Sequence, residues 1–126
     1  MKESMENEAL NQWFEARKQT LETAYLAGLH PWQQSGVGLH TPHRAQDWEV
    51  LRRPLAECVT TSGTFLDIGC ANGYLLECLL RWTEERGLVI IPYGLDFSAQ
   101  LLALAQKRLP QYADHLFLGL DASPDL

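Results

Sequence analysis

The chain has 126 residues and a mass of 14.3 kDa, which fits one small domain. With 46% hydrophobic and 21% charged residues, its composition is typical of a globular protein and not of a disordered one. The formal net charge of −6 and the absence of Lys/Arg runs disfavour nucleic acid as a ligand.

Cysteine usage and hydropathy give an expectation about location. Cys58, Cys70 and Cys78 are an odd number of cysteines without Cys-x-x-Cys spacing, which indicates a reducing compartment. No apolar run approaches the ~20 residues that cross a bilayer, and the N-terminus is too acidic and polar for a signal peptide. We therefore expect a cytoplasmic protein that does not bind membranes.

Residues 1–60 have a helical pattern and form the first predicted segment. Apolar residues at three- and four-residue steps predict one long amphipathic helix before Gly28. A loop follows, in which Trp32 is either a packing anchor or a lid over a ligand. A second helix extends to Val59, with a kink predicted at Pro54 because proline has no amide hydrogen.

The helical spacing also predicts which side chains are buried and which are exposed, in this segment and in the helix that follows Gly73. Periodicity places Trp13 and Trp48, together with Trp82 further along the chain, in the core, and Cys58 and Cys78 are expected as small core residues. Arg52 and Arg53 are expected on a solvated helix face.

His40 and His43 flank Thr41-Pro42 in a loop, a poor geometry for a shared ion, so no metal site is expected.

Residues 61–126 alternate between short strands and helices. The predicted strands are 65–68, 88–95 with Pro92 as an irregularity, and 115–120, and the predicted helices are 74–86 and 98–109. This order predicts an α/β fold, a Rossmann-like parallel sheet with helices on both faces.

A glycine-containing turn follows the first predicted strand. Gly69 and Gly73, with the small Ala71 between them, allow a sharp turn and a close approach of a ligand to the main chain. Asp67 precedes this turn, and its carboxylate would repel a pyrophosphate but attract an ammonium group. The expected ligand therefore has a positively charged end.

Acidic residues also end the other two predicted strands. Asp96 lies 23 residues after Gly73, close to the spacing of roughly 20 at which a carboxylate binds ribose hydroxyls in such units. Phe97 offers an apolar face to a base, and Asp121 can accept a hydrogen bond from an exocyclic amine, although a turn or helix-cap role is equally compatible with Asp121. These residues predict a nucleoside ligand.

Residues 61–122 resemble class I S-adenosylmethionine-dependent methyltransferases through the motif Asp67-Ile68-Gly69-Cys70-Ala71-Asn72-Gly73, in which Ala71 replaces the family's middle glycine. The resemblance implies S-adenosylmethionine as cofactor. It implies that the turn, including the Cys70 backbone, lies along the methionine part, that Asp96 binds the ribose, and that Phe97 and Asp121 adjoin adenine. It also implies that residues 1–60 form a variable cap.

The chain departs from the family pattern after its third predicted strand, where the family's sheet continues. We therefore expect a truncated domain that is inactive on its own, and no catalytic residue is assigned. The acceptor is unidentified, with a small molecule favoured. The family's strand order leaves one edge of the first strand unpaired, so the chain is expected to self-associate through that edge or to cover it with its N-terminal segment.

Two other functions remain open at this stage. One is a degenerate methyltransferase domain that binds a cofactor or partner without catalysis. The other is a nicotinamide-dependent oxidoreductase, which the sequence disfavours because a Gly-x-Gly-x-x-Gly turn would need glycine at Ala71 and three residues further, at Tyr74.

Overall fold

The computed structural model describes residues 2–34 and 44–119, and three parallel strands form its sheet in the order β1-β2-β3. β1 (Gly63–Ile68) pairs along its whole length with β2 (Ile90–Asp96), from Gly63 opposite Ile90 to Ile68 opposite Leu95. β3 (Leu116–Leu118) pairs only with the last three residues of β2. The predicted Rossmann-like parallel sheet is confirmed.

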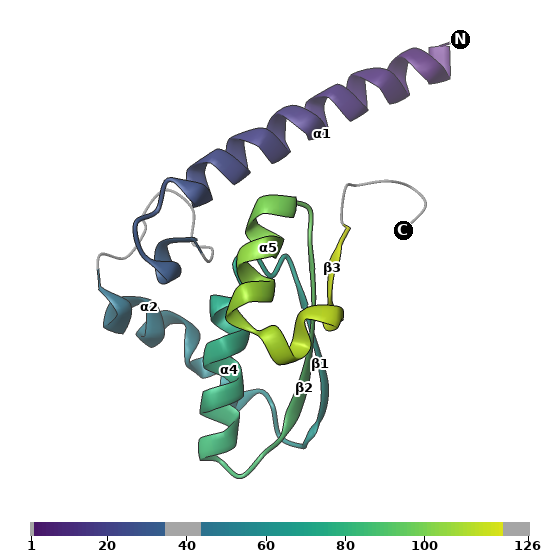
Figure 1. Ribbon diagram of the computed structural model, residues 1–126. Coiled ribbons are helices and arrows are strands. Elements are labelled where there is room, and N and C mark those ends of the chain that lie inside the picture. Colours follow the sequence, from purple (N-terminus) through teal and green to yellow (C-terminus); the bar gives the residue numbers. More distant parts are fainter. Residues whose placement is uncertain (1, 35–43, 120–126) are drawn as a thin grey trace.

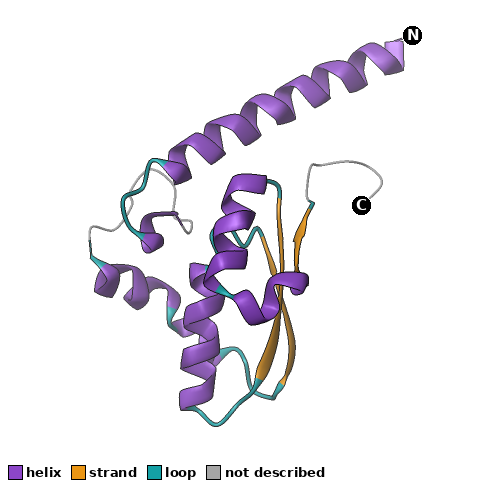
Figure 2. Cartoon of the chain, in the orientation of Figure 1, coloured by secondary structure: helices purple, strands orange, loops and turns teal. Residues whose placement is uncertain are grey.

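Two helices connect the strands and pack on one face of the sheet (Figures 1 and 2). α4 (Tyr74–Glu85) follows the glycine turn, and α5 (Ala99–Arg108) begins after Ser98, whose hydroxyl accepts a hydrogen bond from the Leu101 amide at 3.1 Å. A 3₁₀ segment, η2 (Pro110–His115), leads from α5 to β3. This arrangement directs the carboxyl ends of all three strands toward one edge.

The N-terminal half is helical as predicted. It contains α1 (Lys2–Leu26), η1 (Pro31–Gln34), α2 (Ala45–Arg52) and α3 (Pro54–Glu57). Pro54 is the first residue of α3, and the break between α2 and α3 lies at Arg53, so the predicted interruption is confirmed. Proline is tolerated at a first helical turn, where its missing amide hydrogen would have no partner.

The core assignments hold for residues near the sheet and fail at the periphery. Trp48 and Trp82 are buried, as is Cys78. Trp13, however, is 55% exposed, because α1 extends away from the sheet and none of its residues is buried (Figure 1). Cys58 is also exposed, since it follows the short α3 and lies on its solvent side.

Pro92 lies inside the central strand without disrupting the sheet. It pairs in register with Phe65 of β1, whereas β3 begins to pair with β2 only at Gly94. At Pro92, β3 does not yet pair with β2, so the missing amide hydrogen of Pro92 removes no hydrogen bond between these two strands. Instead, the Pro92 carbonyl contacts Nδ1 of His115 at 3.0 Å.

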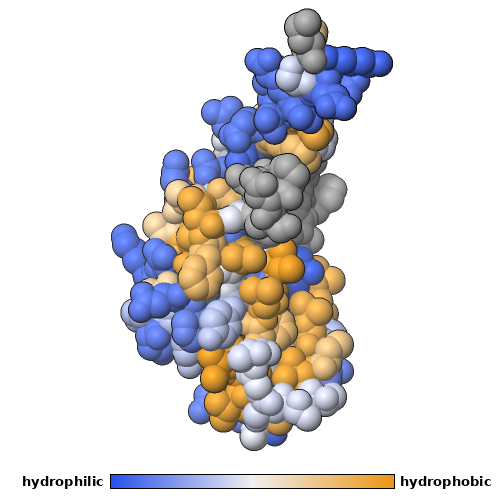
Figure 3. Space-filling model, turned by 90° about the vertical axis from the view of Figure 1, so that its right-hand side faces the viewer, coloured by the Kyte–Doolittle hydropathy of each residue, from blue (hydrophilic) through white to orange (hydrophobic). Residues whose placement is uncertain are grey.

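The expected cover of helices on both faces of the sheet is not seen in the described residues. The second face carries the alternate side chains of the strands, and four of its apolar residues are at least 42% exposed: Leu66, Ile68, Ile91 and Phe117. Figure 3 shows hydrophobic atoms gathered below α1. A one-sided sheet results because both connecting helices of this part of the chain pack on the same face.

Candidate functional site

The turn between β1 and α4 has the backbone conformation that its small residues favour. Gly69, Ala71 and Gly73 have φ values of 81°, 49° and 78°, all in the left-handed region. Ala71, which stands where the family has its middle glycine, is the one non-glycine residue with positive φ in the described chain. Such a conformation costs an alanine about 1–2 kcal/mol, which surrounding contacts must offset.

The two glycines serve different purposes. A Cβ atom at Gly73 would lie 3.0 Å from Cβ of Ala105, so this glycine allows α4 and α5 to approach each other. A Cβ atom at Gly69 would meet nothing within 4 Å. Gly69 therefore leaves open space beside the turn, where a ligand can lie against the main chain.

Four of the five amides of residues 69–73 are bonded within the protein. The Gly69 and Cys70 amides donate to the Leu95 carbonyl, at 2.8 and 2.9 Å, and the Gly73 amide donates to the Cys70 carbonyl at 2.9 Å. The Ala71 amide donates to the Asp96 carboxylate at 3.1 Å. A phosphate needs free N–H donors. With these amides committed, the turn suits a cation better than a phosphate.

Asp96 lies at the centre of the candidate site and is 3% exposed. One carboxylate oxygen accepts from the Ala71 amide and the other from the Ser98 amide, at 3.1 and 3.0 Å. Burial raises the pKa of Asp96, and these two hydrogen bonds oppose the shift. Each carboxylate oxygen has a second acceptor site, so Asp96 can still accept hydrogen bonds from a ligand.

Asp67 and a half-buried arginine share a second part of the site. The pKa of Asp67 is raised to about 6, mainly by burial and to a smaller extent by the negative charge of Asp96, while the Arg52 guanidinium opposes the shift. Asp67 and Arg52 line a cavity of about 160 Å³. Its other lining residues are Tyr25, Leu55, Gly69, Cys70 and Leu75.

The Cys70 thiol faces the core. A Cβ atom at Gly94 would lie 2.8 Å from its sulfur, which shows how closely the thiol packs against β2. Burial raises the pKa of Cys70 to about 12, with smaller contributions from Asp96 and Asp67. A thiol in this state is a poor nucleophile, because only the thiolate attacks.

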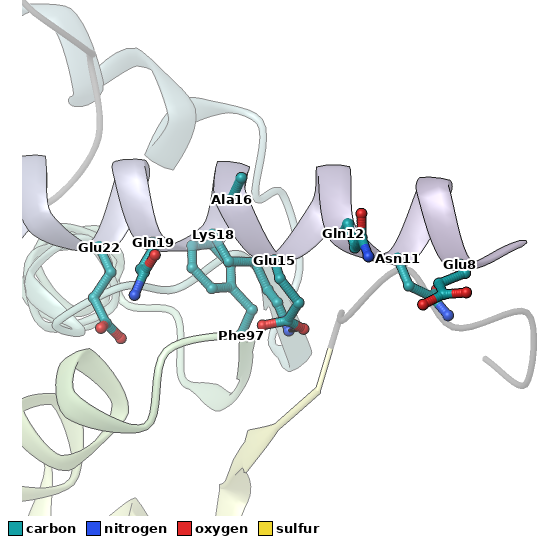
Figure 4. Close-up of a pocket in the computed structure, with 9 residues that line it drawn as sticks. All are labelled: Glu8, Asn11, Gln12, Glu15, Ala16, Lys18, Gln19, Glu22 and Phe97. Atoms are coloured by element: carbon teal, nitrogen blue, oxygen red, sulfur yellow. Dashed lines mark ion pairs between the residues drawn. The ribbon is translucent and has the colours of Figure 1, made fainter. Parts of the chain in front are cut away.

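Phe97 lies on the other side of Asp96, under α1. Its ring points toward the face of α1 that carries Glu15 and Lys18, and together they line an open cavity of about 630 Å³ (Figure 4). The Ser98 hydroxyl donates a hydrogen bond to Glu22, which ties α1 to the start of α5. Asp121, the third acidic residue predicted for the site, lies outside the described residues.

Two residues of the site were missed or misplaced by sequence reasoning. Asn72 is fully buried, and its amide nitrogen donates to the Pro31 carbonyl and to Gln34, at 2.9 and 3.2 Å. Its side-chain oxygen accepts from the Tyr74 amide at 3.1 Å, a local pattern that asparagine before a helix favours. Arg52 is half-buried. It lies four residues after the buried Trp48, and this spacing places both residues on the same side of the helix and could have predicted its partial burial.

Trp32 fits the interpretation as a packing anchor. It stacks on His30 with ring centroids 4.5 Å apart and packs against the cluster that contains Trp48 and Trp82. His40 and His43 lie outside the described residues. Within residues 2–34 and 44–119, no three potential metal ligands cluster, and no helix has the length and apolar character to cross a bilayer.

Comparison with curated proteins gives two matches with the same protein name, one from Claviceps purpurea strain 20.1 and one from Claviceps purpurea. The chain is 32% identical over 90 residues to 4-dimethylallyltryptophan N-methyltransferase easF of Claviceps purpurea. The aligned part covers 66% of this chain and 25% of that protein. No protein-family model matches the chain.

Two solved structures are similar to part of the chain. One is an S-adenosylmethionine-dependent methyltransferase from Geobacter sulfurreducens in complex with S-adenosyl-L-homocysteine, with a TM-score of 0.45 and 22% identity over 79% of this chain and 35% of that one. Another is a putative class I methyltransferase from Listeria monocytogenes, with a TM-score of 0.46 and 18% identity over 83% of this chain and 32% of that one.

The chain is similar to class I S-adenosylmethionine-dependent methyltransferases. It spans about a quarter of the length of the curated relatives it matches, 25% in each case.

Proposed function

We propose that the chain is the S-adenosylmethionine-binding part of a methyltransferase. The observation that carries this proposal is the chemistry of the glycine turn, where four amides are bonded within the protein and a carboxylate stands beside the open space at Gly69. A cofactor with an ammonium group and a ribose matches this arrangement, whereas a dinucleotide pyrophosphate does not.

The residue roles follow from the order of groups along the edge. Asp67 binds the ammonium group, and the turn from Gly69 to Gly73 contacts the methionine part. Asp96 accepts hydrogen bonds from the ribose hydroxyls through its remaining acceptor sites. Phe97 contacts adenine, and Asp121 is proposed to bind its amine on the strength of the motif alone.

Residues 1–60 are proposed as a cap and 61–126 as the cofactor-binding domain. Two contacts support this division, since Asn72 holds Pro31 and Gln34 against the turn and Ser98 bonds Glu22 of α1. Both contacts hold the N-terminal segment next to the carboxyl edge of the sheet. The free cysteines support the proposed cytoplasmic location, because they lack disulfide partners.

A small molecule is the proposed methyl acceptor. The curated relative is named for transfer to nitrogen of 4-dimethylallyltryptophan, which is a small molecule, and the net charge of −6 disfavours nucleic acid. The reaction would move the methyl group from the sulfonium of the cofactor to a nucleophile, with positioning of the two reactants as the main source of rate. No described residue is assigned as catalytic.

A non-catalytic module is the second candidate, and the open sheet supports it. β1 has no partner on its outer edge within the described residues, and one sheet face there is uncovered. In this case the chain alone binds the cofactor, self-associates through β1 and does not transfer methyl groups.

The proposal is tested by isothermal calorimetry of the purified chain with S-adenosylhomocysteine and, separately, with NAD. Binding of the first and not of the second supports it, whereas the reverse result would establish a nicotinamide site. A methyl-transfer assay with small amines then separates the enzyme from the non-catalytic module.

A further inference from the structure

Two opposite charges face the 160 Å³ cavity beside the glycine turn without bonding each other. Arg52 ends α2, and Asp67 lies near the end of β1. Among the described residues, neither side chain has an ion pair or a hydrogen bond. Arg52 nevertheless lies close enough to Asp67 for its charge to act on the carboxylate.

The next residue, Arg53, shows that an arginine at the end of α2 can form an ion pair with a described residue. Arg53 forms an ion pair with Glu85 at 2.7 Å, and its guanidinium lies over the Trp82 ring at 5.8 Å from the centroid. Arg81 and Arg108 also have acidic partners, at 3.4 and 3.5 Å. Arg52 is thus a half-buried cation that lines a cavity and donates no hydrogen bond to any residue of the ranges 2–34 and 44–119.

The size and charge of the cavity limit what can enter it. Whole-ligand pockets have volumes of about 300–1,000 Å³, so a cavity of about 160 Å³ holds only one end of a nucleoside ligand. A group with one positive and one negative charge satisfies both walls, because the ammonium pairs with the carboxylate and a carboxylate accepts from the guanidinium fork. The α-amino acid end of a nucleoside ligand has this chemistry.

We infer that Arg52 binds the α-carboxylate of the cofactor's methionine end while Asp67 binds its α-ammonium group. The inference rests on the proposed function and adds to it a specificity residue contributed by α2. It explains why the two charges remain separated, since a ligand zwitterion fits between them. It also gives the N-terminal cap a direct part in ligand selection.

The test compares two ligands that differ only at this end. S-Adenosylhomocysteine has the amino acid group, and 5′-methylthioadenosine has the same nucleoside without it. Calorimetry is carried out on the wild-type chain, Arg52→Gln, Arg52→Lys and the control Arg53→Gln, with circular dichroism to verify folding. Arg52→Gln should weaken S-adenosylhomocysteine binding about tenfold to a hundredfold, as expected for a lost charge-assisted contact, and change methylthioadenosine binding less than about twofold.

The controls separate the outcomes. Arg52→Lys should recover part of the affinity, and Arg53→Gln should leave the ratio of the two affinities unchanged. Equal losses for both ligands in Arg52→Gln, or no loss for either, would overturn the role of Arg52 while leaving the cofactor site in place. A wild-type chain that binds neither nucleoside would overturn the proposed function, and this inference with it.

Discussion

The Asp96 carboxylate accepts a hydrogen bond from the Ala71 amide at 3.1 Å, across 25 positions of sequence. This bond joins the end of β2 to the glycine turn after β1. It helps to hold Ala71 in its left-handed conformation, with φ of 49°, and it fixes the carboxylate beside the turn. The same acidic group therefore positions the turn and is proposed to bind the ribose.

Replacement of Asp96 tests this double role. Asp96→Ala should weaken S-adenosylhomocysteine binding by about 1.5–3 kcal/mol, the range for hydrogen bonds to a charged group. It should also lower the free energy of unfolding, because the Ala71 and Ser98 amides lose their acceptor. Calorimetry and urea denaturation measure the two effects. Asp114→Ala, at an exposed acidic residue of η2, is the control and should change neither.

The two glycines of the turn should respond differently to the same substitution. Gly69→Val should abolish ligand binding and retain most helical content, because the new side chain enters open space beside the turn. Gly73→Val should destabilise the fold further, since it adds a collision with Ala105 to backbone strain of about 1–3 kcal/mol. Circular dichroism and urea unfolding compare them. Wild-type affinity in Gly69→Val would show that the turn does not contact the ligand.

Ligand affinity should depend on the protonation of Asp67. Its pKa is raised to about 6, mainly by burial, so the folded protein holds this proton more tightly than the unfolded chain does. As pH rises through about 6 the carboxylate ionises, and its attraction for the ligand ammonium increases. Stability has the opposite sign: Asp67 favours folding at low pH, and this contribution is lost as pH rises toward about 6.

Calorimetry over this pH range should therefore show S-adenosylhomocysteine binding that strengthens with pH. Asp96 also has a raised pKa. 5′-Methylthioadenosine controls for its ionisation, because this ligand occupies the nucleoside site and lacks the amino acid group that Asp67 is proposed to bind. In Asp67→Asn, the two ligands should show the same pH dependence of affinity. A pH dependence that persists unchanged in this variant would assign it to another group.

The outer edge of β1 should support self-association. Because the Gly63 amide faces β2, the alternate residues Thr64, Leu66 and Ile68 direct their backbone groups to the free edge. Sedimentation should show a mass that increases with concentration in the wild type. Leu66→Lys, which places a charge on this edge and face, should yield monomers. Val89→Lys is the control, at an exposed residue outside the pairing region. A wild type that stays monomeric at all concentrations would refute the expectation.

Local patterns predicted most of the fold. The strands, the helix start at Ser98, the interruption at Pro54 and the turn at Gly69 and Gly73 depend on short-range preferences, which the sequence displays directly. The positions of Asp67 and Asp96 at neighbouring strand ends followed from parallel topology.

The incorrect predictions concern contacts between elements that are distant in the sequence. Trp13 has the spacing of a buried residue, but burial requires a partner surface, and α1 extends beyond the sheet. Arg52 was predicted to be solvated because a charged residue on a helix usually is. The spacing from Trp48 indicates which side of α2 carries Arg52, but it does not indicate that this side borders the cavity beside the glycine turn.

A nuclear magnetic resonance titration of the ¹⁵N-labelled chain with S-adenosylhomocysteine tests the central claim most directly. We predict saturable shifts in the amide signals of Gly69, Ala71, Asp96 and Phe97, with little change at Gly87, which lies beyond the far end of α4. An absence of shifts at millimolar ligand, or shifts confined to residues away from the carboxyl edge of the sheet, would contradict a cofactor site at the glycine turn.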